Sequence, residues 1–324
     1  MVKAIRIHEP GGPDVLKYED VDVPAPGAGE VLINQKACGL NYIDVYHRMG
    51  AYPLPYPATI GMEGMGVVEA VGDGVTELAP GDRVAYADLP PGAYAEARIM
   101  PWHRLVKLPD AIDDQTAAAM MLQGMTVEYL IRRTFKVSKG DTVLFHAAAG
   151  GVGLIACQWL NHIGATVIGT VGSEEKAELA KAHGCHHTIN YRSENFVERV
   201  KELTHGEGVP VVYDSVGKDT FDGSLDCLKP RGMMVLFGAA SGPAPSIDPN
   251  VLNKKGCLYL TRPSLMVYNK ERAELEACAK ALFDVVTSGK VKIEINQTYP
   301  LAETAQAHRD LEARKTTGST VLLP

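Results

Sequence analysis

The chain has 324 residues, enough for two domains at roughly 100–200 residues per domain. Hydrophobic residues make up 46% of it, which is ordinary for a globular protein with a sizeable core. Lys and Arg total 32 against 39 Asp and Glu, and the net charge of −7 argues against nucleic acid or an anionic membrane surface as the main partner.

The six cysteines are scattered, with no C-x-x-C pair. This pattern is typical of reduced thiols that behave as small apolar side chains. The opening residues MVKAIRI have no apolar core of signal-peptide length, so the sequence predicts no secretion signal there. We therefore expect a cytoplasmic location.

Short β-rich runs follow one another from the N-terminus to about residue 123. Turn signals such as Gly11-Gly12-Pro13 and Pro80-Gly81-Asp82 separate them. Runs and turns at this spacing predict a small β-barrel. The expected strands are Lys3–Ile7, Val31–Ala37, Gly66–Val71, Arg83–Tyr86 and Tyr94–Ile99.

From about residue 124 to 263 the pattern changes to strands that alternate with helices. This alternation predicts a doubly wound parallel sheet. The expected strands are Thr142–Phe145, Thr166–Val171, Thr188–Tyr191, Pro210–Asp214 and Gly232–Phe237. The expected helices are Leu154–His162, Glu174–His183, one that ends near Leu203 and one near Asp219–Cys227.

The last part of the chain predicts a long helix over Lys270–Ser288, a helix over Ala302–Ala313 and a closing strand at Val321–Leu323. We expect that strand to return to the first domain. The predicted domains are therefore 1–123 plus 264–324, which is discontinuous, and 124–263.

An uncharged run from Thr142 to Ser173 carries the most informative motif. Against the pattern G-x-G-x-x-G, Ala148 takes the first slot, Gly150 the second and Gly153 the third. A glycine turn between a strand and a helix brings backbone N–H groups to a pyrophosphate at the helix N-terminus. A plain buried turn and a transmembrane helix are the alternatives, and the central glycines argue against the second.

Six motifs in the right order resemble one known family. The chain resembles the zinc-free quinone oxidoreductase branch of the medium-chain dehydrogenase/reductases, the relatives of zeta-crystallin, over nearly its whole length. The motifs are Gly11-Gly12-Pro13-x-Val15-Leu16, Asn41-Tyr42-Ile43-Asp44-x-Tyr46, Pro80-Gly81-Asp82-Arg83-Val84, Phe145-His-Ala-Ala-Ala-Gly-Gly-Val-Gly153, Val212-Tyr213-Asp214-Ser215-Val216-Gly217 and Thr261-Arg262-Pro263-Ser264.

The resemblance implies an α/β fold with two parts: a GroES-like β-barrel catalytic domain and a doubly wound parallel-sheet (Rossmann) domain that binds NADPH. It also implies an enzyme that reduces a small-molecule quinone, by one-electron transfer in some members, and usually a homodimer. The run Gly256–Thr261 is compatible with a dimer, since apolar edge strands are commonly paired or covered.

The zinc ligands of the wider superfamily have no counterpart in this chain. By the resemblance, Asn41 takes the place of the ligand cysteine and Met62 that of the ligand histidine, and residues 90–115 contain no cysteine for a structural zinc. Zinc needs thiolate, imidazole or carboxylate ligands. We therefore predict a metal-free protein, with Cys38 as a buried strand thiol.

The end of the second expected parallel strand predicts the choice of cofactor. An NAD site places Asp or Glu there, on the ribose 2′-OH. This strand ends in Gly172-Ser173, which leaves room for a 2′-phosphate, and Lys176 follows one helical turn later. The resemblance adds Tyr191 and Arg314 around that phosphate. A solvated helix lysine is the alternative role for Lys176.

The resemblance also assigns the reacting end of the site. It places Asn41, Tyr46 and Tyr52 around the acceptor as the catalytic set, where tyrosines suit a flat aromatic molecule. A structural role for both tyrosines is the alternative. The remaining cofactor-binding residues that it implies are Tyr42, Asp44, Thr126, Gly150, Gly151, Val152, Gly153, Ser215, Phe237 and Arg262.

The sequence leaves two other functions open. An enone or enoyl reductase would use the same cofactor with a different acceptor pocket, and the fold does not separate the two. A non-enzymatic crystallin-like protein that binds NADPH or RNA is the other, although the acidic balance argues against RNA. No general acid stands out, and we expect His146 to be packed or hydrogen-bonded rather than catalytic.

Overall fold

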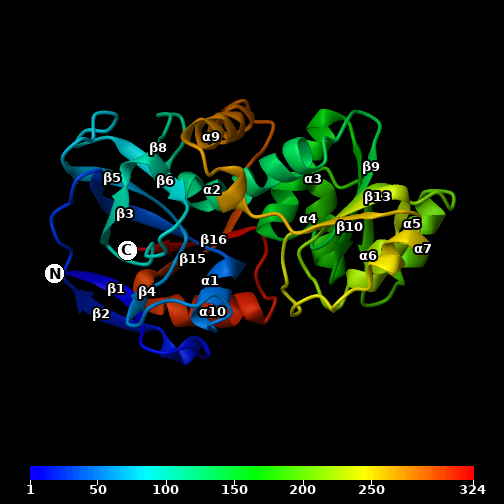
Figure 1. Cartoon of the computed structure of the whole chain (residues 1–324), viewed down its shortest axis with the longest axis horizontal. Helices are drawn as coiled ribbons and strands as arrows, with labels where there is room; N and C mark the ends of the chain where they lie inside the picture. The colour runs from blue at the N-terminus through cyan, green and yellow to red at the C-terminus, as the bar shows by residue number, and fades with distance from the viewer. The chain divides into compact units, whose positions relative to one another are not determined.

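The computed structural model describes residues 1–324, which form two compact units (Figure 1). Unit 1 comprises Met1–Met125, Asn269–Thr287 and Ile293–Pro324. Unit 2 comprises Thr126–Tyr268 and Ser288–Lys292. The assignment of catalytic and nucleotide-binding domains to 1–123 plus 264–324 and to 124–263 stays a prediction.

Unit 1 is built on two β-sheets. The smaller has the strand order β2-β1-β4, and the larger has the order β15-β16-β3-β5-β6-β8, with β7 also paired to β3. The strands are β1 (Val2–Ile7), β2 (Lys17–Val21), β3 (Glu30–Leu40), β4 (Ala58–Thr59), β5 (Glu63–Val71), β6 (Arg83–Ala87), β7 (Ala97–Pro101), β8 (Val106–Lys107), β15 (Ile295–Pro300) and β16 (Ser319–Leu323). The expected strand at Tyr94–Ile99 therefore begins later, at Ala97.

The C-terminal strand closes the larger sheet. β16 pairs antiparallel with β3, with Val321 opposite Gly39, and the red strand lies among the blue and cyan ones in Figure 1. Leu322 is fully buried in the same core cluster as Ile33 and Tyr94. The predicted return of this strand to the first part of the chain is confirmed.

Two helices that lie wholly or mostly in unit 1 were not expected from the sequence. α1 (Tyr42–Arg48) has only seven residues, too few for a clear helical period. α2 (Asp114–Tyr129) is apolar on nearly every side, and Ala117–Met121 is completely or almost completely buried, so it lacks an amphipathic pattern. The other helical segments of this unit are η1 (Pro13–Val15), η2 (Trp102–Arg104), α9 (Arg272–Thr287), η4 (Leu301–Glu303) and α10 (Thr304–Glu312).

Unit 2 contains one sheet of six parallel strands in the order β11-β10-β9-β12-β13-β14. The chain runs outward from β9 to β11 and then restarts on the other side of β9, which makes the β9/β12 boundary the topological switch point. The strands are β9 (Thr142–Phe145), β10 (Thr166–Val171), β11 (His187–Asn190), β12 (Val209–Asp214), β13 (Leu228–Leu236) and β14 (Tyr259–Thr261). The predicted doubly wound sheet is confirmed, with β14 at its edge.

Helices flank this sheet (Figure 1). They are α3 (Gly151–Ile163), α4 (Glu174–Ala182), α5 (Phe196–Leu203), α6 (Phe221–Asp226), α7 (Pro249–Lys254) and α8 (Leu265–Tyr268), with a π-helical turn at Leu130–Thr134. Leu144, Ile168 and Val212 form part of the buried core. Helices cover both faces of the sheet, so the sequences of these strands are apolar runs without alternation.

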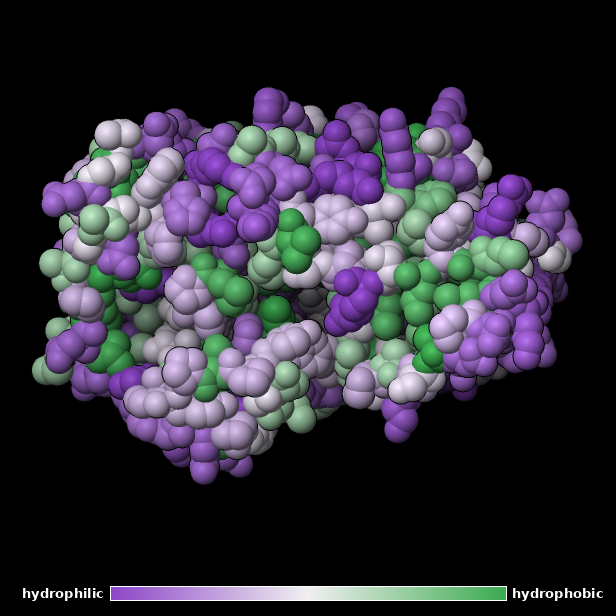
Figure 2. Space-filling view, viewed as in Figure 1, coloured by the Kyte–Doolittle hydropathy of each residue, from purple (hydrophilic) through white to green (hydrophobic).

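The surface carries hydrophilic and hydrophobic side chains intermixed over the visible face (Figure 2). Among all the helices, none has the length and the apolar character needed to span a membrane.

Candidate active site

The glycine turn of unit 2 joins β9 to α3. Gly150 precedes the helix in an extended conformation, and no side chain caps the first turn of α3. The first N–H groups of a helix have no partners within the helix and carry its positive dipole end. The N-terminus of α3, with Gly151 and Val152 in its first turn, is therefore suited to an anionic group such as a pyrophosphate.

Gly153 lets α3 approach the end of β9 closely. A Cβ atom at this position would overlap the carbonyl oxygen of Ala147 and would lie 2.7 Å from Cα of Ala148. Both neighbours are backbone, so neither can move aside easily. The third slot of the motif thus requires glycine for close packing, as the pattern predicts.

The carboxyl end of β10 offers no acidic side chain to a ribose. Ser173 caps α4 by accepting a hydrogen bond from the backbone N–H of Lys176 at 3.3 Å. A Cβ on Gly172 would lie 2.6 Å from the hydroxyl oxygen of Tyr191, so these two residues are neighbours. The first acidic residue, Glu174, accepts a hydrogen bond from the side chain of Asn190 at 2.9 Å.

Three further predicted residues follow directly after parallel strands of unit 2. Ser215 follows β12, Phe237 follows β13, and Arg262 follows β14 and donates a hydrogen bond to the carbonyl of Leu236 at 3.1 Å. Carboxyl ends of parallel strands meet at one edge of a sheet, where ligands bind in folds of this kind. The ring of Phe237 lies 5.8 Å from that of Phe145, centroid to centroid.

Thr126 and Arg314 belong to other elements. Thr126 is a buried residue of α2. Arg314 follows α10 in unit 1, is exposed, and has a φ of 58°. Their predicted contacts with a cofactor stay predictions.

The predicted acceptor residues of unit 1 gather around α1. Asn41 precedes the helix, and its backbone N–H donates to the Asp44 carboxylate at 2.9 Å, which closes the first turn. The ring of Tyr46 lies 5.5 Å from that of Tyr42 and 5.8 Å from that of Tyr52. Tyr52 is 42% exposed, so this three-tyrosine cluster reaches the surface.

The buried carboxyl group of Glu63 orients Asn41, a role that the sequence did not predict. The Asn41 Nδ2 donates to Glu63 Oε2 at 2.6 Å, and Gln123 Nε2 donates to Asn41 Oδ1 at 3.2 Å. The Glu63 Oε1 accepts from the backbone N–H of Leu122 at 2.9 Å. The signal that could have identified Glu63 is its position directly after Met62, the residue at the place of the superfamily's ligand histidine.

Burial changes the acid–base behaviour of this cluster. It raises the pKa of Glu63 to about 8, against the hydrogen bonds from Asn41 and Leu122 that favour the ionised form. It also raises the pKa of Asp44 to about 7, although that carboxylate accepts a hydrogen bond from the Tyr94 hydroxyl at 2.7 Å. Unit 1 therefore holds two carboxyl groups that titrate near neutral pH.

No group of three or more His, Cys, Asp or Glu side chains is arranged to hold a metal ion. Met62, at the position of the superfamily's ligand histidine, is fully buried. Cys38 is buried in β3 and donates to the carbonyl of Ala93 at 2.8 Å, so the predicted strand thiol is confirmed.

His146 is 1% exposed and lies between two hydroxyl groups, those of Thr170 at 2.9 Å and Ser224 at 3.0 Å. The prediction that it is hydrogen-bonded is confirmed. The partners themselves could not be predicted, because they come from β10 and α6.

A unit built on two β-sheets and a doubly wound unit with a glycine turn are the two parts of a two-domain, nucleotide-dependent dehydrogenase. Comparison with known proteins supports this class. Residues 27–110 match the model of the alcohol dehydrogenase GroES-like domain, and residues 151–280 match the model of the zinc-binding dehydrogenase. The expected two-part fold is confirmed.

Relatives of known name match over the full length. The chain is 53% identical to a quinone oxidoreductase of Pseudomonas aeruginosa, covering 100% of both chains. It is 49% identical to a 2-haloacrylate reductase of a Burkholderia species, covering 100% of this chain and 99% of the other. The crystal structure of Escherichia coli quinone oxidoreductase complexed with NADPH is 46% identical, with a TM-score of 0.98 over 99% of this chain and 100% of that one.

The chain belongs to the quinone oxidoreductase family of the medium-chain dehydrogenase/reductases. The resemblance seen in the sequence is confirmed, and the protein is an oxidoreductase.

Proposed function

We propose that this protein reduces quinones with NADPH and without zinc. The observation that carries the proposal is the full-length identity of 53% and 46% to two quinone oxidoreductases, one of which has been solved with NADPH. The glycine turn and the end of β10 support the cofactor, and the cluster around α1 supports the acceptor.

The residues of unit 2 fit NADPH. The uncapped N-terminus of α3 would hold the pyrophosphate, and the small, non-acidic end at Gly172-Ser173 would accept a 2′-phosphate. Lys176, Tyr191 and Arg314 would donate to that phosphate by charge-assisted or neutral hydrogen bonds. When bound, NADPH supplies the reducing equivalents of the reaction.

The residues of unit 1 fit a flat carbonyl acceptor. Glu63 and Gln123 hold the two ends of the Asn41 amide, so the amide has one preferred orientation. Tyr46 and Tyr52 would supply stacking surface and hydroxyl donors to a quinone oxygen. Positioning of the acceptor, rather than a strong general acid, would then provide most of the rate increase.

A second function, reduction of an activated alkene, is favoured by one specific observation. The 2-haloacrylate reductase is 49% identical over the whole chain, close to the identity of the quinone oxidoreductases. The same cofactor would serve both reactions, and only the acceptor pocket would differ.

The proposed form is a cytoplasmic homodimer. β14 lies at the edge of the parallel sheet, and Tyr259 on it is 58% exposed, so a second copy could extend the sheet there. Light scattering that gives the mass of a monomer would reject the dimer.

The first experiment follows NADPH absorbance with 1,4-benzoquinone and, separately, with an enone. Each reaction is run with and without EDTA and is repeated with NADH. Fast, EDTA-insensitive quinone reduction that prefers NADPH is the expected result. Turnover with the enone alone would reject quinone reduction and support the second function, reduction of an activated alkene. Turnover with neither would reject both.

A further inference from the structure

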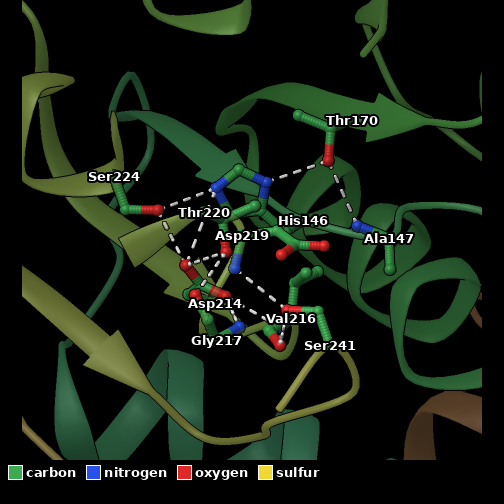
Figure 3. A network of polar contacts seen from close by, with 10 residues as sticks. All are labelled: His146, Ala147, Thr170, Asp214, Val216, Gly217, Asp219, Thr220, Ser224 and Ser241. Carbon is green, nitrogen blue, oxygen red and sulfur yellow. Dashed lines mark hydrogen bonds and ion pairs between the residues drawn. The ribbon is translucent and has the colours of Figure 1, made fainter. Parts of the chain in front are cut away.

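A line of side-chain hydrogen bonds, which we call the turn relay, crosses unit 2 from β12 to the glycine turn (Figure 3). Asp214 accepts from the Ser224 hydroxyl at 2.7 Å, and Ser224 Oγ lies 3.0 Å from Nε2 of His146. Nδ1 of His146 lies 2.9 Å from Oγ1 of Thr170, which accepts from the backbone N–H of Ala147 at 3.3 Å. The relay thus joins a buried carboxylate to the first residue of the turn.

The direction of the bonds follows from the Asp214 end of the relay. The Ser224 hydroxyl gives its only proton to Asp214, so towards His146 it can only accept, and Nε2 carries the ring proton that it accepts. On a neutral ring Nδ1 then has no proton, so it accepts from the Thr170 hydroxyl, whose oxygen in turn accepts from the Ala147 N–H. Burial lowers the pKa of His146, which agrees with the neutral ring that this direction requires.

Asp214 is a fixed anchor for the relay. Its carboxylate is 0% exposed and accepts three further hydrogen bonds, from the backbone N–H groups of Val216 at 2.8 Å and Gly217 at 3.0 Å and from the Thr220 hydroxyl at 2.7 Å. Four donors therefore surround this carboxyl group and hold it in one orientation at the end of the relay.

The other end of the relay controls the shape of the turn. Ala147 has a φ of 56°, which residues other than glycine rarely adopt. This conformation directs its carbonyl to accept from the N–H of Gly150 at 3.0 Å and brings that carbonyl against Gly153. The backbone carbonyl of Thr170 holds the next residue, Ala148, by a 3.0 Å bond from its N–H. Thr170 therefore holds the first two residues of the turn that leads into α3, Ala147 through its side chain and Ala148 through its backbone.

We propose that Thr170 and His146 are positioning residues for dinucleotide binding. Through Ala147 they hold the turn and the N-terminus of α3 in the shape that receives the pyrophosphate, and they make no contact with the cofactor themselves. The proposal rests on the proposed use of NADPH.

The test compares three variants by titration calorimetry with NADPH. Thr170→Val keeps the shape of the side chain but leaves the Ala147 N–H without its acceptor, and we expect the Kd to rise roughly tenfold. Thr170→Ser keeps the hydroxyl and should restore a Kd close to that of the wild type. Thr220→Val removes a donor to the same Asp214 outside the relay, so it should lower stability without changing the Kd.

A second measurement reads the relay without the cofactor. With ¹⁵N-labelled histidine, and His146→Asn to assign its signal, NMR should show His146 protonated on Nε2. Exchange of the Ala147 amide with solvent should be faster in Thr170→Val than in Thr220→Val.

Each outcome decides the proposal. A ring protonated on Nδ1, or an equal rise in Kd for Thr170→Val and Thr220→Val, would overturn it. Failure of the wild type to bind NADPH would instead reject the proposed function, and the NMR measurements would still decide whether the relay holds the turn.

Discussion

Each unit of the molecule has a buried carboxyl group at the centre of a polar cluster, Asp214 in unit 2 and Glu63 in unit 1, and the two groups differ in the number of donors that surround them. Asp214 in unit 2 accepts four hydrogen bonds, two of them from backbone N–H groups at the start of a turn. Glu63 in unit 1 accepts from the Asn41 side chain and from the N–H of Leu122, and burial raises its pKa to about 8.

The difference shows how backbone geometry sets the chemistry of a buried acid. A carboxyl group surrounded by four donors, as Asp214 is, is held in one orientation and can serve as a rigid anchor. Glu63 has fewer donors, and burial raises its pKa to about 8, so this group can gain or lose a proton near neutral pH. On this view unit 2 is built to hold a shape, whereas unit 1 keeps a cluster that can exchange protons beside Asn41.

The largest effect expected is from Gly153→Ala, which tests the rigidity of unit 2. The new Cβ would overlap the backbone of Ala147, and this backbone cannot move away without displacing α3. We expect NADPH affinity to fall on the order of 100-fold. Gly12→Ala is the control, because open space surrounds that position and its φ is −69°. A Kd near the wild-type value for Gly153→Ala would show that the turn tolerates displacement.

Replacing each buried acid by its amide tests the comparison directly. Asp214→Asn puts N–H donors against the hydroxyls that now donate to it, and we expect unit 2 to lose about 2 kcal/mol of stability at pH 7. Glu63→Gln resembles the protonated acid that the raised pKa of Glu63 favours at pH 7, so its cost should stay below about 1 kcal/mol.

The two tryptophans make this measurement possible unit by unit. Trp102 lies in unit 1 and Trp159 in unit 2, so urea unfolding in single-tryptophan backgrounds reports on each separately. Equal losses from the two amide substitutions would contradict the distinction between the two acids.

We expect a smaller effect from Lys176→Ala, which tests whether unit 2 also determines the preference for NADPH over NADH. Loss of a charge-assisted bond to a 2′-phosphate in Lys176→Ala should raise the KM for NADPH roughly tenfold and leave that for NADH nearly unchanged. Lys181→Ala on the same helix is the matched control, since its side chain pairs with Glu178. Equal changes for both cofactors would remove Lys176 from the site.

The smallest effect is the pH dependence of unit 1. The pKa values of Glu63 and Asp44 are raised in the folded state to about 8 and about 7, so both groups hold protons there that the unfolded chain releases. Their contribution to stability is present at acid pH and is lost as pH rises through these values.

We therefore expect the urea midpoint of unit 1, followed through Trp102, to fall between pH 5 and pH 9. Glu63→Gln should make this decline shallower because it removes one of the two groups that lose a proton in this pH range. An unchanged slope in that variant would show that Glu63 is ionised throughout.

Much of the fold could be predicted from the sequence. Apolar runs between turn residues identified β9 and β10 with their exact bounds, and the glycine turn identified the start of α3. The helices α1 and α2 could not be predicted, since one is too short and the other too uniformly apolar to show a period. The candidate site followed the same division, because the glycines Gly150 and Gly153 belong to one local motif whereas the role of Glu63 depends on partners from other parts of the chain.

The sequence by itself determined the parallel sheet, the glycine turn and the family, because these depend on local periodicity and on residues at fixed spacing. Only the tertiary structure brought Glu63 to Asn41 and linked Asp214, through Ser224, His146 and Thr170, to the turn. Such contacts join residues far apart in the chain. Their partners are set by strand register and helix packing, which no local pattern encodes.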